Sequence, residues 1–373
     1  MPVYWSMLIV TTCIGIISQY RRNPSTILEG RKINRIYAGF AIIAVSYIIF
    51  FVGFRDRVAD SGTYINTFNN IPSQWNEMIK YVFENDLDIG FYLPTGIFKI
   101  VFSESHYAWF FVIAIISCTC LFRVVYKYSE DFPLSIYFFV ASCMFTWLIN
   151  GMRQFVAVCI LFAFTDWLIE GKKIKYILLA LAVSTIHSSA IFAIPICLFI
   201  SSKKILDKKM MLFGVITVIG INFAGPIFSL LGTALDMDYA DSLSSGGGSN
   251  VIRLVVNCIP LILVLLSKKY MDREAPPSIK LAANMSFISA CFSLASTFTN
   301  GILIGRMPIY FSVYELYLFP WIFRHCFEKK SRAIMTGLFI IGYLLYFIYQ
   351  MEIAWGGLIY TSDFLNLEFL PGT

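Results

Sequence analysis

The chain has 373 residues, of which 58% are hydrophobic and only 14% are charged, whereas an average soluble chain has roughly 25% charged residues. This composition excludes a soluble enzyme. The 29 Lys and Arg exceed the 23 Asp and Glu by six, but the charges lie between long apolar runs, so the excess does not indicate nucleic acid as a partner. A hydrocarbon core ~30 Å thick needs roughly 20 apolar residues per crossing. We therefore predict an all-α, polytopic integral membrane protein with about twelve transmembrane helices in one membrane domain, residues 1–373.

The first apolar runs set the predicted orientation. Residues 3–18 have no Lys or Arg before them and residues 19–35 carry five, which is opposite to the charge order of a cleaved signal peptide. The positive-inside rule places the N-terminus outside and residues 19–35 in the cytoplasm. Residues 36–54 return to the outside, where a long loop over residues 55–106 follows. The next predicted crossings are residues 107–122, 134–149 and 155–169.

His187 lies in the middle of the following apolar stretch, residues 176–201. One continuous helix here would put Lys203 and Lys204 outside and invert every later loop. Two short helices that break near His187 keep the positive charges inside, so we predict the break. The remaining predicted helices are residues 210–231, 252–266, 281–303, 307–323 and 333–349. This topology keeps 22 of the 29 Lys and Arg in the cytoplasm and leaves the C-terminal tail outside.

Two long segments are predicted on the outer face, residues 55–106 and residues 232–251. The first contains an apolar stripe at helical spacing, which predicts a short helix in the membrane interface: Trp75, Met78, Ile79, Val82 and Phe83. It then contains residues 93–102, an apolar run too short to span and broken by Pro94, which indicates a re-entrant segment. The second segment is rich in Gly and Ser, a composition typical of mobile loops. It is equally consistent with a loop that gates a groove and with a flexible linker that has no further role.

The sequence has no motif for a metal or a nucleotide. We find no CxxC, no HExxH, no glycine-rich phosphate loop and no internal repeat, and the nine cysteines form no disulfide framework. We therefore predict no cofactor and no metal.

Seven cations remain on the outer face, the side that disfavours them, and they are Arg55, Arg57, Lys80, Lys99, Arg153, Arg253 and Arg306. A single one of them is explained by snorkelling or by a nearby acid. Arg55, Arg153 and Arg306, however, come from three different helix ends at one membrane face. An Arg fork suits a bidentate grip on phosphate oxygens, and a lipid-linked phosphate or diphosphate is the natural anion at that depth.

Candidate proton acceptors lie beside these cations. Asp56, Asp60 and Asp88 suit a general base for a sugar hydroxyl, and they equally suit loop caps or partners of the arginines. His187 sits at the predicted helix break, where an imidazole accepts a proton or donates to a phosphate, although a lone His in an apolar setting is more often structural.

These residues resemble the EpsG family of bacterial membrane proteins, which is grouped with Wzy-type polysaccharide polymerases. The resemblance rests on an ordered set of short motifs over residues 36–325: Arg55 before Asp60 and Tyr64 in D-x-x-x-Y spacing, Asp88-Ile89-Gly90-Phe91, Asn150-Gly151-Met152-Arg153-Gln154, His187-Ser188-Ser189-Ala190, and Gly305-Arg306-Met307 with Tyr310. One departure is Ala59, where the family often has Gly.

The resemblance implies a membrane-embedded glycosyltransferase of the bacterial cytoplasmic membrane with its active site facing outward. It would transfer a growing glycan, for an O-antigen, capsule or exopolysaccharide, from undecaprenyl diphosphate to a lipid-linked repeat unit. Further partners would be a chain-length regulator and a flippase. The residues that the resemblance assigns are Asp60 or His187 as the base and Arg55, Tyr64, Asp88, Arg153, Gln154, Arg306 and Tyr310 as substrate-binding residues.

Three other functions stay open at the level of sequence. A flippase or transporter for the lipid-linked oligosaccharide would hold its cations near the membrane midplane and not at one face. A glycosyltransferase or ligase that uses a polyprenyl-phosphate donor would need similar groups on the same side. If the protein is a scaffold in an exopolysaccharide assembly complex, substitution of the arginines should affect polysaccharide production only by changing the amount of protein.

Overall fold

The computed structural model describes residues 2–20, 35–85, 87–223, 247–301, 304–355 and 358–368. Residues 21–34 of the predicted cytoplasmic loop and residues 232–246 of the predicted second outer loop lie outside the described residues. Within the predicted membrane domain the chain forms two compact units, which we describe separately. Unit 1 comprises residues 1–164, 178–191 and 328–373, and unit 2 comprises residues 165–177 and 192–327.

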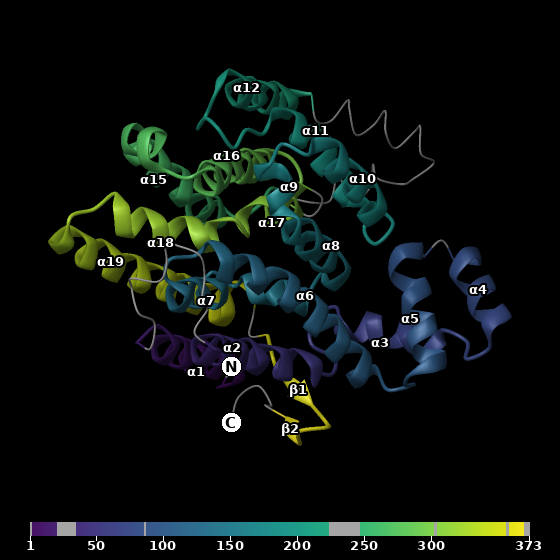
Figure 1. Cartoon of the computed structure of the whole chain (residues 1–373). Helices are drawn as coiled ribbons and strands as arrows, with labels where there is room; N and C mark the ends of the chain where they lie inside the picture. The colour runs from purple at the N-terminus through teal and green to yellow at the C-terminus, as the bar shows by residue number, and fades with distance from the viewer. Residues whose placement is uncertain are drawn as a thin grey trace. The chain divides into compact units, whose positions relative to one another are not determined.

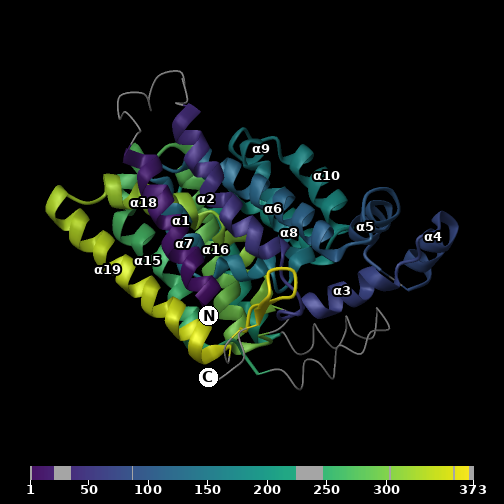
Figure 2. The same cartoon turned by 90° about the horizontal axis from the view of Figure 1, so that it is seen from below.

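Unit 1 consists of helices and one short hairpin (Figure 1). Its elements are α1 (Pro2–Tyr20), α2 (Arg35–Gly53), α3 (Ser61–Asn70), α4 (Trp75–Glu84), α5 (Ile89–Val101), α6 (His106–Tyr128), α7 (Phe132–Ala141), the 3-10 helix η2 (Met144–Leu148), α8 (Met152–Ala163), α19 (Lys329–Ile348), the π-helix η5 (Tyr349–Ala354), and strands β1 (Thr361–Ser362) and β2 (Leu367–Glu368). Helix α1 packs along α2 and α7, and α2 packs along α6 (Figure 2). The short helices α3 and α5 pack against α6, and α4 packs against α5.

Unit 2 is arranged around α16 (Pro277–Phe298), a helix whose side chains are largely buried. The other elements are α9 (Thr165–Ile169), α11 (Ala193–Phe199), α12 (Lys208–Asn222), α15 (Val251–Glu274), the 3-10 helix η4 (Ile304–Arg306), α17 (Ile309–Ser312) and α18 (Glu315–His325). Helix α10 (Lys173–Ser184) divides between the two units, and the 3-10 helix η3 (Ser188–Phe192) follows it. The side chain of Asp207 begins α12 by accepting from the backbone N–H groups of Lys209 and Met210, each at 3.1 Å.

Among the described residues, four helices are long and apolar enough to cross a membrane: His106–Tyr128, Val251–Glu274, Pro277–Phe298 and Lys329–Ala354. Six shorter apolar helices accompany them, Pro2–Ile17, Gly39–Gly53, Ile89–Val101, Phe132–Ala141, Met152–Ala163 and Ser188–Phe199. The chain is therefore an all-α membrane protein. The twelve crossings stay a prediction.

Several predicted boundaries need correction. The predicted helix over residues 134–149 ends at Ala141, because Cys143 has a left-handed backbone (φ +61°) and a 3-10 turn follows it. Helix α5 starts at Ile89 and continues through Pro94, so the predicted interruption there is wrong. The break near His187 is confirmed, since α10 ends at Ser184.

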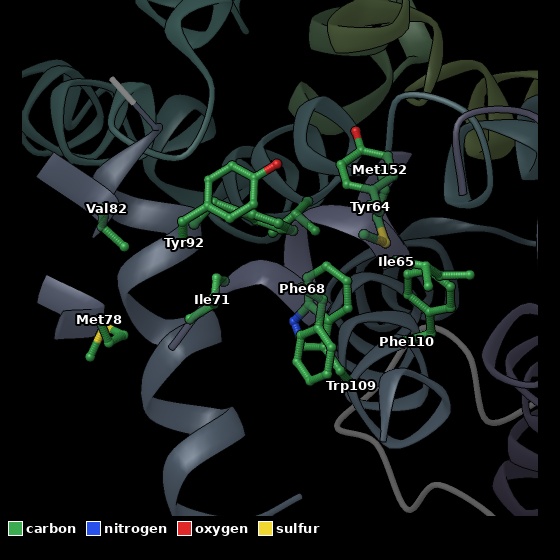
Figure 3. Packing of buried hydrophobic residues seen from close by; sticks show 12 residues of the cluster. Tyr64, Ile65, Phe68, Ile71, Met78, Val82, Tyr92, Trp109, Phe110 and Met152 are labelled. Carbon is green, nitrogen blue, oxygen red and sulfur yellow. The ribbon is translucent and has the colours of Figure 1, made fainter. Parts of the chain in front are cut away.

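The predicted interfacial helix is present as α4, and its apolar stripe has two parts. Met78 and Val82 are fully buried in an apolar cluster with residues of α3, α5, α6 and α8 (Figure 3). Trp75, Ile79 and Phe83 are 49%, 42% and 57% exposed. Exposed apolar side chains four residues apart leave one edge of α4 suited to the membrane interface.

Lys99 holds the end of α3. From α5, its ammonium group donates to the carbonyl oxygens of Phe68, Asn69 and Ile71 at 2.9, 2.8 and 2.5 Å. These carbonyls belong to the last turn and the C-cap of α3, where backbone carbonyls lack N–H donors from their own helix. This outer cation therefore has a structural role in the described contacts.

We expect Lys99→Met to destabilise unit 1 by about 2 kcal/mol, because three buried carbonyls lose a charged donor. The unfolding midpoint of the detergent-solubilised protein measures this. Lys80→Met is the matched control, since Lys80 makes only an exposed pair with Glu84 at 3.6 Å, worth about 0.5 kcal/mol or less. Equal shifts for the two variants would contradict the structural role.

Candidate functional site

The Arg55 side chain is fully buried just after α2. Its Nε donates to the Ser61 hydroxyl at 2.7 Å, one Nη donates to the carbonyl of Val52, and the other lies 3.4 Å from the sulfur of Met152. The guanidinium carbon is 3.9 Å from the ring centroid of Phe110. Burial lowers the pKa of Arg55 to about 9, so the group stays charged at neutral pH. No carboxylate among the described residues forms an ion pair with it.

The C-terminal hairpin packs against the residues around Arg55. Asp56 accepts from the Tyr107 hydroxyl at 2.6 Å and from the backbone N–H of Asp363 at 2.5 Å, and its own N–H donates to the carbonyl of Thr361 at 2.9 Å. The ring of Phe364 stacks on Phe54 with a centroid distance of 4.4 Å. Asp56 therefore anchors the tail to the loop. Arg55 was predicted to reach an outer-face anion, but in this structure it has no exposed surface with which to do so.

Asp60 occupies the N-cap position of α3 and is partly exposed. With its amide nitrogen turned toward the carboxylate, Asn150 donates to both Asp60 oxygens, at 3.2 and 2.5 Å. The preceding residue, Ala59, has a left-handed backbone with φ +50°, a conformation that glycine adopts without strain. The turn before Asp60 therefore has the geometry that a Gly would favour, although this chain has Ala there.

Arg153, in the first turn of α8, lies next to two of the predicted residues, Asp88 and Tyr64, and next to Tyr92. It forms an ion pair with Asp88 at 2.5 Å. Its guanidinium carbon lies 5.9 Å from the ring centroid of Tyr64 and 5.5 Å from that of Tyr92. The hydroxyl groups of these two tyrosines lie at the same edge of the apolar cluster (Figure 3). The Nε of Arg153 is buried and has no hydrogen-bond partner among the described residues.

Gly151 sets the direction in which α8 leaves the preceding turn. It has a left-handed backbone with φ +81°, and a Cβ at this position would lie 3.0 Å from the ring of Trp147. Asn150, just before it, and Arg153, just after it, therefore reach Asp60 and Asp88 respectively. Gln154 is fully buried in the same helix.

Asp88 starts α5 beside the break that precedes His187. The backbone N–H of Gly90 donates to the carbonyl of Thr185 at 2.9 Å, and a Cβ on Gly90 would lie 2.2 Å from the Thr185 hydroxyl. A cavity of about 440 Å³ lies here, lined by Asp88, Gly90, Ser184 and Thr185 among others. Partial burial raises the pKa of Asp88, and the charge of Arg153 partly opposes this. His187 lies two residues beyond Thr185, with its Nδ1 2.7 Å from the Ser189 hydroxyl.

Unit 1 therefore brings five predicted residues next to the segment 150–153 or into it: Arg55 contacts Met152, Asp60 contacts Asn150, and Tyr64 and Asp88 lie beside Arg153. The sequence reasoning missed two of their partners, Asn150 and Tyr92. Each lies inside or next to a motif that was already singled out, and that adjacency is the signal that was available. Within the described residues, no group of three His, Cys, Asp or Glu side chains is arranged to hold a metal ion.

Arg306 and Tyr310 belong to unit 2. Arg306 is exposed at the end of η4, and Tyr310 is buried in α17. Arg253, another of the outer cations, donates to the carbonyl of Gly305 at 2.9 Å and so fixes the backbone just before Arg306.

The end of the second outer loop is ordered against this turn. The Ser249 N–H donates to the carbonyl of Ser296 at 3.0 Å, and the Gly301 N–H donates to the carbonyl of Gly247 at 3.3 Å. A Cβ on Gly248 would lie 1.9 Å from the Thr297 carbonyl oxygen. The glycines that suggested a linker thus permit a close backbone approach.

We expect Arg55→Lys to destabilise the protein by about 2 kcal/mol, because an ammonium group does not reproduce the planar fork that joins Ser61, Val52 and Met152. Thermal unfolding of purified protein measures the change. Arg57→Lys, at an exposed neighbouring position, is the control and should leave the midpoint within about 1 °C of wild type. A midpoint for Arg55→Lys that matches the control would show that the three contacts contribute nothing.

Gly248→Ala and Gly247→Ala should behave differently although they are neighbours. The first places a Cβ against the Thr297 carbonyl and must displace the segment, whereas a Cβ on Gly247 has nothing within 4 Å. We expect limited proteolysis to cut this loop several times faster in Gly248→Ala than in wild type, with Gly247→Ala close to wild type. Equal cleavage of the two variants would rule out the close approach.

Comparison with known proteins assigns the chain to a family. No curated protein and no solved structure matches it. The family model described as EpsG family matches residues 39–359, which is most of the chain and includes every motif discussed above. The chain therefore belongs to the EpsG family, a family of Wzy-type polysaccharide polymerases.

Proposed function

We propose that this protein polymerises a polysaccharide by transferring a growing glycan from undecaprenyl diphosphate to a lipid-linked repeat unit at the outer face of the cytoplasmic membrane. Family membership supports polysaccharide polymerisation in general. The observation that carries the finer proposal is Arg153, a partly exposed guanidinium with a buried Nε that has no partner among the described residues, held by an ion pair with Asp88 on another segment. A cation, an acceptor for protons and a cavity next to one another are what glycosyl transfer from a lipid diphosphate requires.

Arg153 is proposed to bind the diphosphate. Its fork matches two phosphate oxygens, and it stabilises the negative charge that grows on the leaving diphosphate as the glycosidic carbon–oxygen bond breaks. Arg55 adds a second positive charge from the interior, because no described carboxylate neutralises it. Arg55 is fully buried and so does not contact the diphosphate directly in this arrangement. The role of Arg306 as a further phosphate ligand stays a prediction from the sequence.

Asp60 is proposed to activate the acceptor. The acceptor hydroxyl oxygen attacks the anomeric carbon of the donor, its proton passes to the carboxylate, and the lipid diphosphate leaves with the electrons of the broken bond. Asn150 supports this role because its amide holds the carboxylate as an acceptor next to the Arg153 segment. His187 is the alternative base, two residues beyond Thr185, which lines the cavity at Asp88. A chain-length regulator and a flippase stay predicted partners.

The test is chain extension in vitro with purified protein and a purified lipid-linked repeat unit. We expect Arg153→Ala to lower the rate of extension about 100-fold or more, as the loss of one donor to a developing oxyanion does. If Asp60 is the base, Asp60→Asn should lower the rate of extension at least as far. If the imidazole of His187 is the base, His187→Gln should have that effect instead. Arg57→Ala, an exposed cation in the same loop, should extend chains at the wild-type rate.

Product length distinguishes the enzyme classes. A polymerase yields a ladder of many repeat units, whereas a ligase or single-sugar transferase adds once. A wild-type ladder from Arg153→Ala at normal protein level would refute the diphosphate assignment.

A further inference from the structure

A second cavity, of about 370 Å³, lies between α5, α6 and α8 in unit 1. Its lining includes Pro94 and Ile97 of α5, Ile116 of α6 and Ile160 of α8. Thr95 is the one lining residue with a hydroxyl, and that hydroxyl donates to the carbonyl of Phe91 at 2.7 Å within its own helix. The cavity therefore offers a nearly continuous apolar wall, which we call the apolar groove.

The apolar groove adjoins the cavity beside Asp88. Gly90 and Pro94 line both cavities, and the second cavity is also lined by Asp88, whose carboxylate pairs with Arg153. The cavity at one end thus has in its wall the carboxylate that holds the Arg153 guanidinium, a group suited to an anion, and the groove at the other end is apolar except for Thr95. That arrangement matches an amphiphile with an anionic head and a hydrocarbon tail.

The outer rim of the groove is also apolar. Phe102, Ile97, Ile116 and Val112 are lining residues that remain 74%, 38%, 40% and 37% exposed. Exposed apolar residues around an apolar opening leave a path by which a long chain passes from the groove into the bilayer.

We infer that the apolar groove holds the isoprene units nearest to the diphosphate of the polyisoprenoid carrier, an inference that rests on the proposed function. An apolar cavity of about 150 Å³ holds one benzene, so this volume accommodates about two or three isoprene units. Lipid tails are as apolar as the groove, so the groove adds little nonspecific affinity. Its effect is to fix the chain next to the headgroup and so place the diphosphate at Arg153.

The experiment measures equilibrium binding of a chain-length series to the purified full-length protein in phosphatidylcholine nanodiscs. The probes are isopentenyl, farnesyl and undecaprenyl diphosphate, with 5, 15 and 55 carbons, and binding to empty nanodiscs is subtracted. In wild type we expect affinity to rise about tenfold or more from the five-carbon to the fifteen-carbon probe. It should rise little from there to the longest probe, because the groove is then full.

Ile116→Trp fills the groove, and Ile115→Trp is its matched control. Both residues lie on α6 and both are 40% exposed, but only Ile116 lines the groove. We expect Ile116→Trp to bind the five-carbon probe with wild-type affinity but to bind the fifteen-carbon probe no more tightly. Ile115→Trp should keep the increase in affinity from the five-carbon to the fifteen-carbon probe. Ile97→Trp, from α5, is the second groove-filling variant should Ile116→Trp not fold.

Each remaining outcome separates the groove from the proposed function. Unchanged chain-length dependence in the groove-filling variants, or equal loss in Ile115→Trp, would overturn the groove assignment. If Arg153→Ala then weakens all three probes, the diphosphate site stands without the groove. If phosphatidylglycerol added to the nanodiscs abolishes the increase in affinity with probe length, the groove is a site for ordinary phospholipids. That result would also overturn the inference. No saturable binding of any probe to wild type would overturn both proposals.

Discussion

The arrangement of the candidate site depends on Arg55, a buried cation without an ionic partner among the described residues. A charge inside a protein is costly unless its hydrogen bonds are made. The planar guanidinium meets this requirement by reaching three segments at once, through Val52, Ser61 and Met152. Because α3 and α8 begin at these contacts, satisfying Arg55 also determines where Asp60 and Arg153 lie. The hydrogen bonds that stabilise the buried Arg55 charge therefore also position the candidate site residues Asp60 and Arg153.

Backbone geometry supplies the rest of the site. Gly151 turns the chain with a positive φ, so that the residues on either side of it reach carboxylates on different segments. Gly90 lets the start of α5 contact the break before His187, which brings a carboxylate, a helix break and two cavities together. These close approaches are possible because no side chain stands between the two backbones. Their positions bring four of the five motifs into unit 1, whereas the motif around Arg306 belongs to unit 2.

Sequence patterns predicted most of the helices, since apolar length and charge order report directly on membrane crossing. They also predicted the break at His187 and the helix that begins at Trp75. They missed the left-handed turn at Cys143, because it lies inside an apolar run with no local turn signal. They predicted an interruption at Pro94 that does not occur. Proline lacks one backbone N–H, but the other backbone hydrogen bonds of α5 are still made.

The sequence by itself determined the class of the protein and its family, and it singled out the charged residues that are predicted at the outer face. Composition and motif order contain that information, because both are properties of the chain read in one dimension. Only the tertiary structure decided what each charge contacts. In the tertiary structure Arg55 is buried, and Lys99 donates to carbonyls at the end of α3. Arg253 donates to the carbonyl just before Arg306, and the Nε of Arg153 is buried without a partner among the described residues. Burial and hydrogen-bond partners depend on packing between distant segments, and local sequence does not encode that packing.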